Sequence, residues 1–374
     1  MFAKNLLTQI FHIRYPIIQA PMSPLTTPEL VANVSNAGGM GTIAGARMTA
    51  EQLTNEIQQV RSLTDKPFGV NLFIPPKQTE ISAQMIDSVR KELKRLIAKG
   101  KVSDCRIDFD SISVKPPKDL YPEQIEVILK EKVSVLSFTF GYVSDDIIKK
   151  CKESNIRLIG TATTAKEAVL LKEKGCDAVC LQGSEAGGHR GSFLTNDLET
   201  IEQSTIGLQS LLSQTTQFID PASYPMIAAG GIMDGAGLVN ALTSGASGVQ
   251  MGTRFLTCHE SKQLVPEAHR RLLLEARRNI NEVRPTVLTR AYTGKPARGM
   301  RTAITDQFRE KMMLPWQYQA QLVLPLCKYA AETKQIDFMQ LWAGQNYARC
   351  EDQSATEIIQ QVMREAKEIL KRYK

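Results

Sequence analysis

The stretch Asp177-Ala-Val-Cys-Leu-Gln-Gly-Ser-Glu-Ala-Gly-Gly-His-Arg-Gly191 joins a short apolar run to a glycine-rich loop. The run 177–182 is typical of a strand that is buried on both faces, and the loop places His189 among glycines that let backbone approach a ligand closely. A histidine that only fills a core more often lies among apolar neighbours on a periodic segment. His189 is therefore the first candidate for chemistry; the alternative is a tight turn with a solvated imidazole.

Seven further apolar runs are bounded by turn residues in the same way. The eight candidate strands are 16–20, 39–44, 68–73, 133–138, 157–161, 177–182, 225–229 and 247–251. Helical patterns lie between them at 28–36, 50–63, 122–130, 144–153, 165–174, 205–212 and 235–243. Alternating strands and helices imply parallel strands, in an open doubly wound sheet or in a closed barrel. The count of eight favours an α/β fold of the (β/α)8 TIM barrel type.

The open sheet ranks second because the first run lacks the sequence that such a sheet would need. A Rossmann sheet has a glycine fingerprint directly after its first strand and an acidic residue further on. The chain has Pro21-Met-Ser-Pro24 at this point instead.

Two segments fall outside the repeat. The barrel domain is predicted to span 1–260, with a helical insertion at about 75–120 that contains an amphipathic helix at 81–100. After the eighth strand, 261–338 reads as a smaller, mostly helical domain that covers the substrate. The segment 339–374 returns to the barrel, and its helix begins at a Ser354…Glu357 capping box and is expected to take the eighth outer position.

Composition narrows the classes of partner. The chain has 374 residues, 43% of them apolar, and 46 basic against 39 acidic residues give a net charge of +7. The basic residues are spread over helical segments, so no nucleic-acid partner is predicted, and the excess mildly favours an anionic ligand. No segment approaches the roughly 20 apolar residues of a membrane span, and 1–14 lacks a signal-peptide core. We expect a cytoplasmic protein without a membrane partner.

The cysteines and histidines do not indicate a metal. Seven scattered cysteines are typical of reduced thiols rather than of a disulfide framework. The four histidines lie far apart, and Cys176 and Cys180 lack the spacing of paired metal ligands. No metal site is predicted, and the sequence allows a homo-oligomer without requiring one.

In a TIM barrel the ligand site lies at the carboxyl ends of the strands. Small residues follow the last two predicted strands, namely Gly230, Gly231, Gly252 and Thr253. A phosphate needs backbone N–H groups with no side chain in the way, so these loops predict a phosphate site, with ordinary tight turns as the alternative. Asn71 and Gln182 carry amides that both donate and accept, as the edge of a heteroaromatic ring requires; loop-to-loop hydrogen bonding is the alternative.

Taken together, these motifs resemble the nitronate monooxygenases, formerly called 2-nitropropane dioxygenases. The resemblance covers nearly the whole chain, and its combination of motifs is specific although each motif alone is not. The matching segments are Tyr15-Pro-Ile-Ile-Gln-Ala-Pro-Met22, Gly69-Val-Asn-Leu-Phe73, Gln182-Gly-Ser-Glu-Ala-Gly-Gly-His-Arg-Gly191, Ala228-Ala-Gly-Gly-Ile-Met-Asp-Gly235, Gln250-Met-Gly-Thr-Arg-Phe-Leu256 and Trp342-Ala-Gly-Gln345. The region 79–118 is the least similar.

The resemblance implies an FMN cofactor and a set of site residues. Asn71 and Gln182 would contact the flavin ring or its ribityl chain, and Pro21 and Met22 would line the ring. The phosphate end would be held by Gly187, Gly230, Gln250, Met251, Gly252 and Thr253, with Gly188 and Gly231 completing the cofactor-binding set. His189 would be the catalytic residue at the reactive edge of the ring, and Gln345 would close the pocket.

The resemblance also implies the reaction. The substrates would be a small anionic nitronate, such as propionate 3-nitronate, and O2, and the products a carbonyl compound and nitrite or nitrate, formed through a one-electron flavin semiquinone. A nitronate is already an anion. His189 would therefore donate a hydrogen bond to it, and would act as a base only toward a neutral nitroalkane.

Other functions share these motifs. An FMN-dependent NAD(P)H reductase, acting on an enoyl-acyl-carrier protein or on a quinone, is the alternative enzyme, and a barrel that binds a phosphorylated ligand without turnover is the third. Two pairs of residues also have open roles. Lys295 and Arg298 either stabilise charge on the flavin or are solvated, and Trp316 and Tyr318 either line the pocket or pack the small domain.

Overall fold

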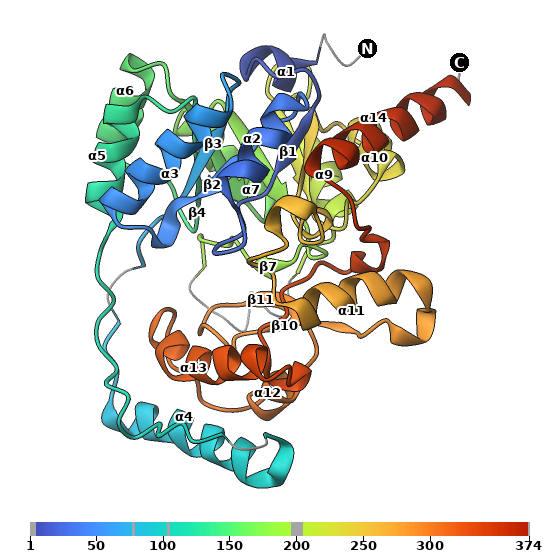
Figure 1. Cartoon of the computed structure of the whole chain (residues 1–374). Coiled ribbons are helices and arrows are strands. Elements are labelled where there is room, and N and C mark those ends of the chain that lie inside the picture. The colour runs from blue at the N-terminus through green and yellow to red at the C-terminus, as the bar shows by residue number, and fades with distance from the viewer. Residues whose placement is uncertain (1–4, 77–78, 103–104, 196–204, 373–374) are drawn as a thin grey trace.

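The computed structural model describes residues 5–76, 79–102, 105–195 and 205–372 (Figure 1). Eight parallel strands form one sheet: β1 (Ile17–Gln19), β2 (Thr42–Ala44), β3 (Gly69–Phe73), β4 (Val135–Thr139), β5 (Arg157–Ala162), β6 (Ala178–Gln182), β8 (Met226–Ala229) and β9 (Gly248–Met251). Consecutive strands of this sheet pair with each other from β2 to β9, and β9 pairs with β1. A parallel bridge between Ile18 and Met40 closes the ring. The predicted TIM barrel is confirmed, with a strand at each of the eight predicted runs.

The outer layer consists of α2 (Pro28–Asn36), α3 (Ala50–Leu63), α5 (Tyr121–Glu131), α6 (Asp145–Glu153), α7 (Ala165–Glu173), α9 (Leu208–Thr216), α10 (Gly235–Thr243) and α14 (Ala355–Arg372). The last helix packs against α10 and α2 and so occupies the eighth outer position, as predicted. Its first turn has the expected capping box, in which Glu357 accepts from the Ser354 N–H at 2.7 Å and donates its own N–H to Ser354 Oγ at 3.2 Å. None of the described helices has the length and apolar character needed to span a bilayer.

One short helix, α1 (Leu6–Ile10), lies outside the predicted elements. Its Leu7 is fully buried in the cluster that fills the barrel interior, together with Ile18, Ile159 and Ile227. A side chain on Gly248 would lie 2.3 Å from Leu7 Cδ2, so β9 needs a glycine where this helix packs. A helix of five residues is too short to show a periodic pattern in the sequence.

The segment after β9 forms a second layer over the carboxyl ends of the strands (Figure 1). It contains α11 (Glu267–Arg278), β10 (Thr286–Thr289), β11 (Ala297–Met300), α12 (Ala303–Gln307) and α13 (Tyr318–Glu332). The sequence predicts a mostly helical segment here, and its pattern does not predict the hairpin that β10 and β11 form. The hairpin forms an antiparallel sheet with β7 (Gly188–His189), in which Ala297 is opposite His189 and Arg298 is opposite Gly188. This sheet joins the small layer to the barrel loop that carries the candidate histidine.

The helix in the insertion, α4 (Ala83–Leu96), lies far from the barrel and packs on α12 and α13 (Figure 1). Its Val89, Leu93 and Leu96 are buried in the hydrophobic cluster of the small layer. The insertion therefore stabilises the covering layer rather than the barrel that it interrupts.

The packing of α14 generates a test of the fold. Ile359 is fully buried, whereas the next residue, Gln360, is exposed on the same helix. We expect Ile359→Ala to lower the free energy of unfolding by about 2–5 kcal/mol, because the truncation leaves a cavity under the helix. Gln360→Ala, the control, should change it by less than about 0.5 kcal/mol. Urea unfolding followed by circular dichroism measures both, and equal effects would contradict the placement of α14.

Candidate active site

His189 lies in β7 at the carboxyl end of the barrel, beneath the covering layer. Its Nε2 is 2.9 Å from Thr293 Oγ1. The Thr293 hydroxyl also donates to the Lys295 carbonyl at 3.4 Å, so it uses its single proton there and accepts from Nε2–H. This network assigns the proton to Nε2 and leaves the Nδ1 lone pair without a described donor.

The half-buried imidazole of His189 is held neutral by its surroundings. Burial is the largest cause that lowers its pKa, and the positive charges of Arg47 and Lys295 add to it, giving a value of about 3. The ring is therefore unprotonated at any pH at which the protein would work.

Four aromatic side chains surround this imidazole. The centroids of Phe73, Phe140, Trp316 and Trp342 lie 6.3, 6.0, 6.5 and 5.8 Å from that of His189. Phe140 follows β4 with a φ of +77°, a conformation that is rare for a bulky residue and that here turns its ring toward the cluster. These rings come from the barrel and from the covering layer, and together they surround the imidazole with apolar surface.

Two cations act on the same space. Lys295 Nζ lies 4.3 Å from the centroid of Phe140 and 5.5 Å from that of Trp316, and burial lowers its pKa to about 8. Among the described residues, neither Lys295 nor Arg47 has a carboxylate within ion-pair distance. The positive charges of a partly buried lysine and an exposed arginine, neither with a described counter-ion, would attract an anion toward His189.

The second basic candidate, Arg298, has a different role. Its Nε donates to Ser184 O at 2.7 Å and its NH1 donates to Thr286 Oγ1 at 3.1 Å. The guanidinium therefore ties the loop before His189 to the hairpin. Trp316 and Tyr318 also have different roles. Trp316 joins the cluster around His189, whereas Tyr318 is buried in the core of the small layer.

The two predicted amides are placed differently from each other. Gln182 Nε2 donates to His189 O at 2.8 Å, and its Oε1 accepts from Gly191 N at 2.8 Å. Gln182 thus uses both ends of its amide on the His189 loop. This is the loop-to-loop hydrogen bonding that was the alternative to contact with a ring edge. Asn71 donates from Nδ2 to Ser137 Oγ at 3.0 Å, and its Oδ1 has no described partner. Gln250 makes no side-chain hydrogen bond to a described residue.

The predicted phosphate loops have free donors. Gly230 and Gly231 have φ values of +127° and +68°, and Gly252 precedes the 3-10 helix η4 (Thr253–Phe255). The backbone N–H groups of Gly231, Gly252 and Thr253 find no acceptor among the described residues. Free N–H groups on adjacent loops, one of them at a helix start, favour an anion.

The two predicted glycines of the His189 loop, Gly187 and Gly188, differ from the glycines that follow β8 and β9. A side chain at Gly187 would lie 2.5 Å from Gly344 N, so its size is explained by packing against the C-terminal segment. Gly188 has a φ of +74° and open space where a side chain would stand.

The remaining predicted residues lie around these features. Pro21 and Met22 follow β1 and are half-buried at the barrel mouth. Met251 is only 1% exposed and packs in the core, so it presents backbone to the site. Gln345 is exposed, donates its backbone N–H to Glu185 O at 2.9 Å, and lines a pocket of about 440 Å³ with Gly230 and Gly231.

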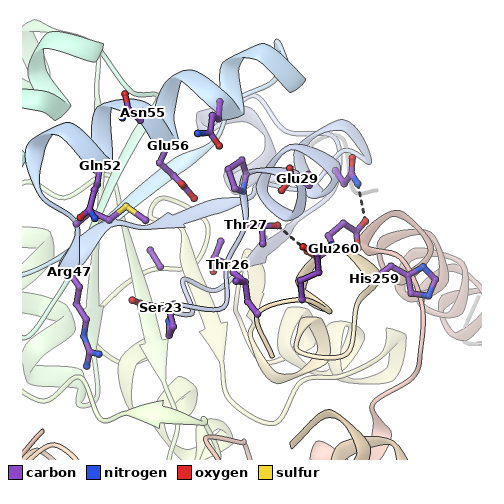
Figure 2. Close-up of a pocket in the computed structure, with 18 residues that line it drawn as sticks. Ser23, Thr26, Thr27, Glu29, Arg47, Gln52, Asn55, Glu56, His259 and Glu260 are labelled. Atoms are coloured by element: carbon purple, nitrogen blue, oxygen red, sulfur yellow. Dashed lines mark hydrogen bonds between the residues drawn. The ribbon is translucent and has the colours of Figure 1, made fainter. Parts of the chain in front are cut away.

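A groove of about 1120 Å³ opens beside the barrel mouth (Figure 2). It is lined by α2, α3, the segment after Met22 and the 3-10 helix η5 (His259–Ser261). Figure 2 shows Glu29 and Glu56 at its upper wall and Arg47 at its left side. Burial and then the charge of Glu29 raise the pKa of Glu56. Arg47 lines the groove, and its positive charge also lowers the pKa of His189.

Sequence reasoning missed three residues of the site, namely Arg47, Phe140 and Thr293. Arg47 lies in the 3-10 helix η2 (Gly45–Arg47), directly after β2, and Phe140 directly follows β4. Inspecting the residues after every predicted strand would have found both. Thr293 had no signal, because it meets His189 only through the β7–β11 pairing.

The chain is similar to known proteins over almost its whole length. A family model described as nitronate monooxygenase matches residues 4–365. A chain described as "Probable nitronate monooxygenase" from Staphylococcus aureus (strain MSSA476) is 38% identical over 378 residues, covering 99% of each chain. One of the same description from Staphylococcus haemolyticus is 38% identical over 374 residues, again covering 99% of each.

Two solved structures are similar over almost their whole lengths. A nitroalkane oxidase from Streptomyces ansochromogenes has a TM-score of 0.84 and 32% identity, covering 99% of this chain and 100% of that one. FabK from Thermotoga maritima has a TM-score of 0.73 and 27% identity, covering 99% of this chain and 98% of that one.

Proposed function

Because the chain belongs to the nitronate monooxygenase family, whose members are oxidoreductases, we propose that it oxidises alkyl nitronates with O2 to carbonyl compounds and nitrite or nitrate, with FMN as its cofactor. The observation that supports this most is the positively charged space, lined by aromatic rings, around a neutral His189. Lys295 and Arg47 have no counter-ion among the described residues there, so an anionic substrate would supply it.

The residues present fit FMN. The free N–H groups of Gly231, Gly252 and Thr253 would hold its phosphate. The open space at Gly188 leaves room for the ring, and the free Oδ1 of Asn71 would accept a hydrogen bond from the edge of the ring. Met22, which is half-buried at the barrel mouth beside Gly252, would line the ring. When bound, the flavin supplies one-electron acceptance and reaction with O2, which no side chain of this site provides.

The protein's own residues bind and orient the nitronate. Lys295 and Arg47 would attract its charge, and the rings of Phe73, Phe140 and Trp316 line the space with apolar surface, which strengthens the attraction. His189 presents its Nδ1 lone pair rather than a donor, so charge stabilisation falls to the two cations. A ring with a pKa of about 3 is a weak base, which favours nitronates over neutral nitroalkanes as substrates.

The first test follows the flavin spectrum of the purified protein without oxygen. We expect an alkyl nitronate, such as propionate 3-nitronate, to reduce the bound flavin, and NADH to leave it unchanged over the same time. Readmitting air should restore the oxidised spectrum with release of nitrite or nitrate. Rapid bleaching by NADH with no response to the nitronate would instead identify an NAD(P)H reductase, and a protein that takes up no flavin would identify a non-catalytic barrel.

Replacing the histidine separates the two substrate forms. In His189→Asn we expect turnover of a neutral nitroalkane, already slow in the parent because the base is weak, to fall further by roughly 100-fold, because that base is lost. Turnover of the preformed nitronate should stay within about threefold, since no proton is removed from it. His12→Asn is the control, because His12 is exposed with a φ of +54°, which asparagine tolerates. Equal losses with both substrates would rule out this division of roles.

The charge of Lys295 predicts a pH dependence. Its pKa of about 8 means that the amine is charged below that pH and neutral above it. We therefore expect kcat/KM for a preformed nitronate to fall as the pH rises through about 8. Lys295→Arg should move that descending limb to higher pH, and Lys295→Met should remove it and lower kcat/KM about tenfold at neutral pH. Lys311→Met, at an exposed lysine, should keep the parent profile, and a limb unchanged in Lys295→Arg would disprove the assignment.

A further inference from the structure

A buried carboxylate lies directly behind the His189 loop and is not part of the anion site. Glu167 is in the first turn of α7, which follows β5, and its side chain is 1% exposed. A buried carboxylate is costly unless its oxygens are hydrogen-bonded or paired. Its partners therefore show what the residue is for.

Four donors converge on this carboxylate, and none of them is a charged group. Oε2 accepts from the N–H and the hydroxyl of Thr163 at 2.7 and 2.8 Å. Oε1 accepts from the backbone N–H groups of Phe193 and Leu194 at 2.7 and 3.1 Å. Because the Thr163 proton goes to Glu167, the contact of 2.7 Å between Thr163 Oγ1 and Ser192 Oγ is donated by Ser192.

These bonds connect two segments that meet only in the folded protein. Thr163 belongs to the turn after β5, and Ser192, Phe193 and Leu194 are the end of the loop that begins at His189. The start of that loop is held by Gln182 and by the β7–β11 pairing. Glu167 is the carboxylate that fixes the other end of the loop to the barrel.

The charge of Glu167 also reaches the cations of the site. It acts on Lys295 and on Arg190, and in both cases it opposes the lowering of the pKa that burial causes. Arg190 donates to Gln182 O and Thr163 O and is thereby occupied by backbone. Lys295 has no ion pair with a described residue. Glu167 is the carboxylate whose negative charge raises its pKa.

We propose that Glu167 is a positioning residue, which holds the loop from His189 to Leu194 against the end of β5. The inference rests on the proposed function where it is measured by nitronate turnover. It has a second consequence that needs no turnover, because the amides of Phe193 and Leu194 are protected from solvent exchange only while the carboxylate accepts from them.

The test compares Glu167→Gln and Glu167→Asp in the flavin-loaded protein. Glutamine keeps the shape but loses the charge and turns an amide NH2 toward groups that are themselves donors. In Glu167→Gln the descending limb of kcat/KM against pH should therefore move to lower pH than in the parent. The kcat of this variant should fall about tenfold, because His189 is misplaced. Aspartate keeps the charge but is shorter, so kcat should fall while the limb stays in place. Glu173→Gln, at an exposed position of the same helix, is the control for both.

Hydrogen–deuterium exchange supplies the readout without activity. Peptides that cover 189–195 should exchange faster in Glu167→Gln than in the parent and unchanged in Glu173→Gln. If Glu167→Gln does not fold, Thr163→Val replaces it, since it removes one of the four bonds and leaves the charge. Faster exchange of the same peptides with the parent pH limb then supports the proposal.

Two results would overturn the proposal. One is parent exchange and a parent pH profile in Glu167→Gln, and the other is an identical pH limb in Glu167→Gln and Glu167→Asp with equal loss of kcat, which describes a purely structural residue. A parent protein without nitronate turnover would refute the proposed function alone, because the exchange experiment would still report on Glu167.

Discussion

The pairing of β7 with β11 is the contact on which the candidate site depends. It brings Ala297 opposite His189 and Arg298 opposite Gly188, although the two strands are far apart in the chain. Without it, Thr293, Lys295 and Trp316 would have no fixed position relative to the barrel. So short a strand pairing suffices because Arg298 and Gln182 hold the flanking backbone by further hydrogen bonds.

The covering layer and the barrel divide the work of the site between them. The barrel supplies the backbone donors of the glycine loops, the ring of Phe73 and the histidine itself. The layer supplies the hydroxyl that orients the imidazole, a lysine and two tryptophans. Because residues of both parts bury His189 and Lys295, the lowered pKa values of these two groups depend on the folded arrangement rather than on either segment alone.

Charged residues near the site have two separate purposes. Arg298, Arg190 and Glu167 are hydrogen-bonded to backbone or side chains of neighbouring loops, so they hold those loops in place. Lys295 and Arg47 have no such partners among the described residues, and their charges remain for a ligand. Residue type alone does not distinguish these purposes, since an arginine a few positions from a lysine looks equally basic in the sequence.

The sequence by itself determined the barrel, because each strand and helix of the repeat carries its own local signal in apolar runs, caps and periodicity. It also located His189 and the glycine loops, since the carboxyl ends of barrel strands are where ligands bind. Only the tertiary structure decided that Gln182 serves the loop, that Lys295 rather than Arg298 faces the site, that Arg47, Phe140 and Thr293 belong to it, and that Glu167 lies behind its loop. Their roles depend on contacts between segments distant in the chain, and such contacts leave no periodic pattern in either segment.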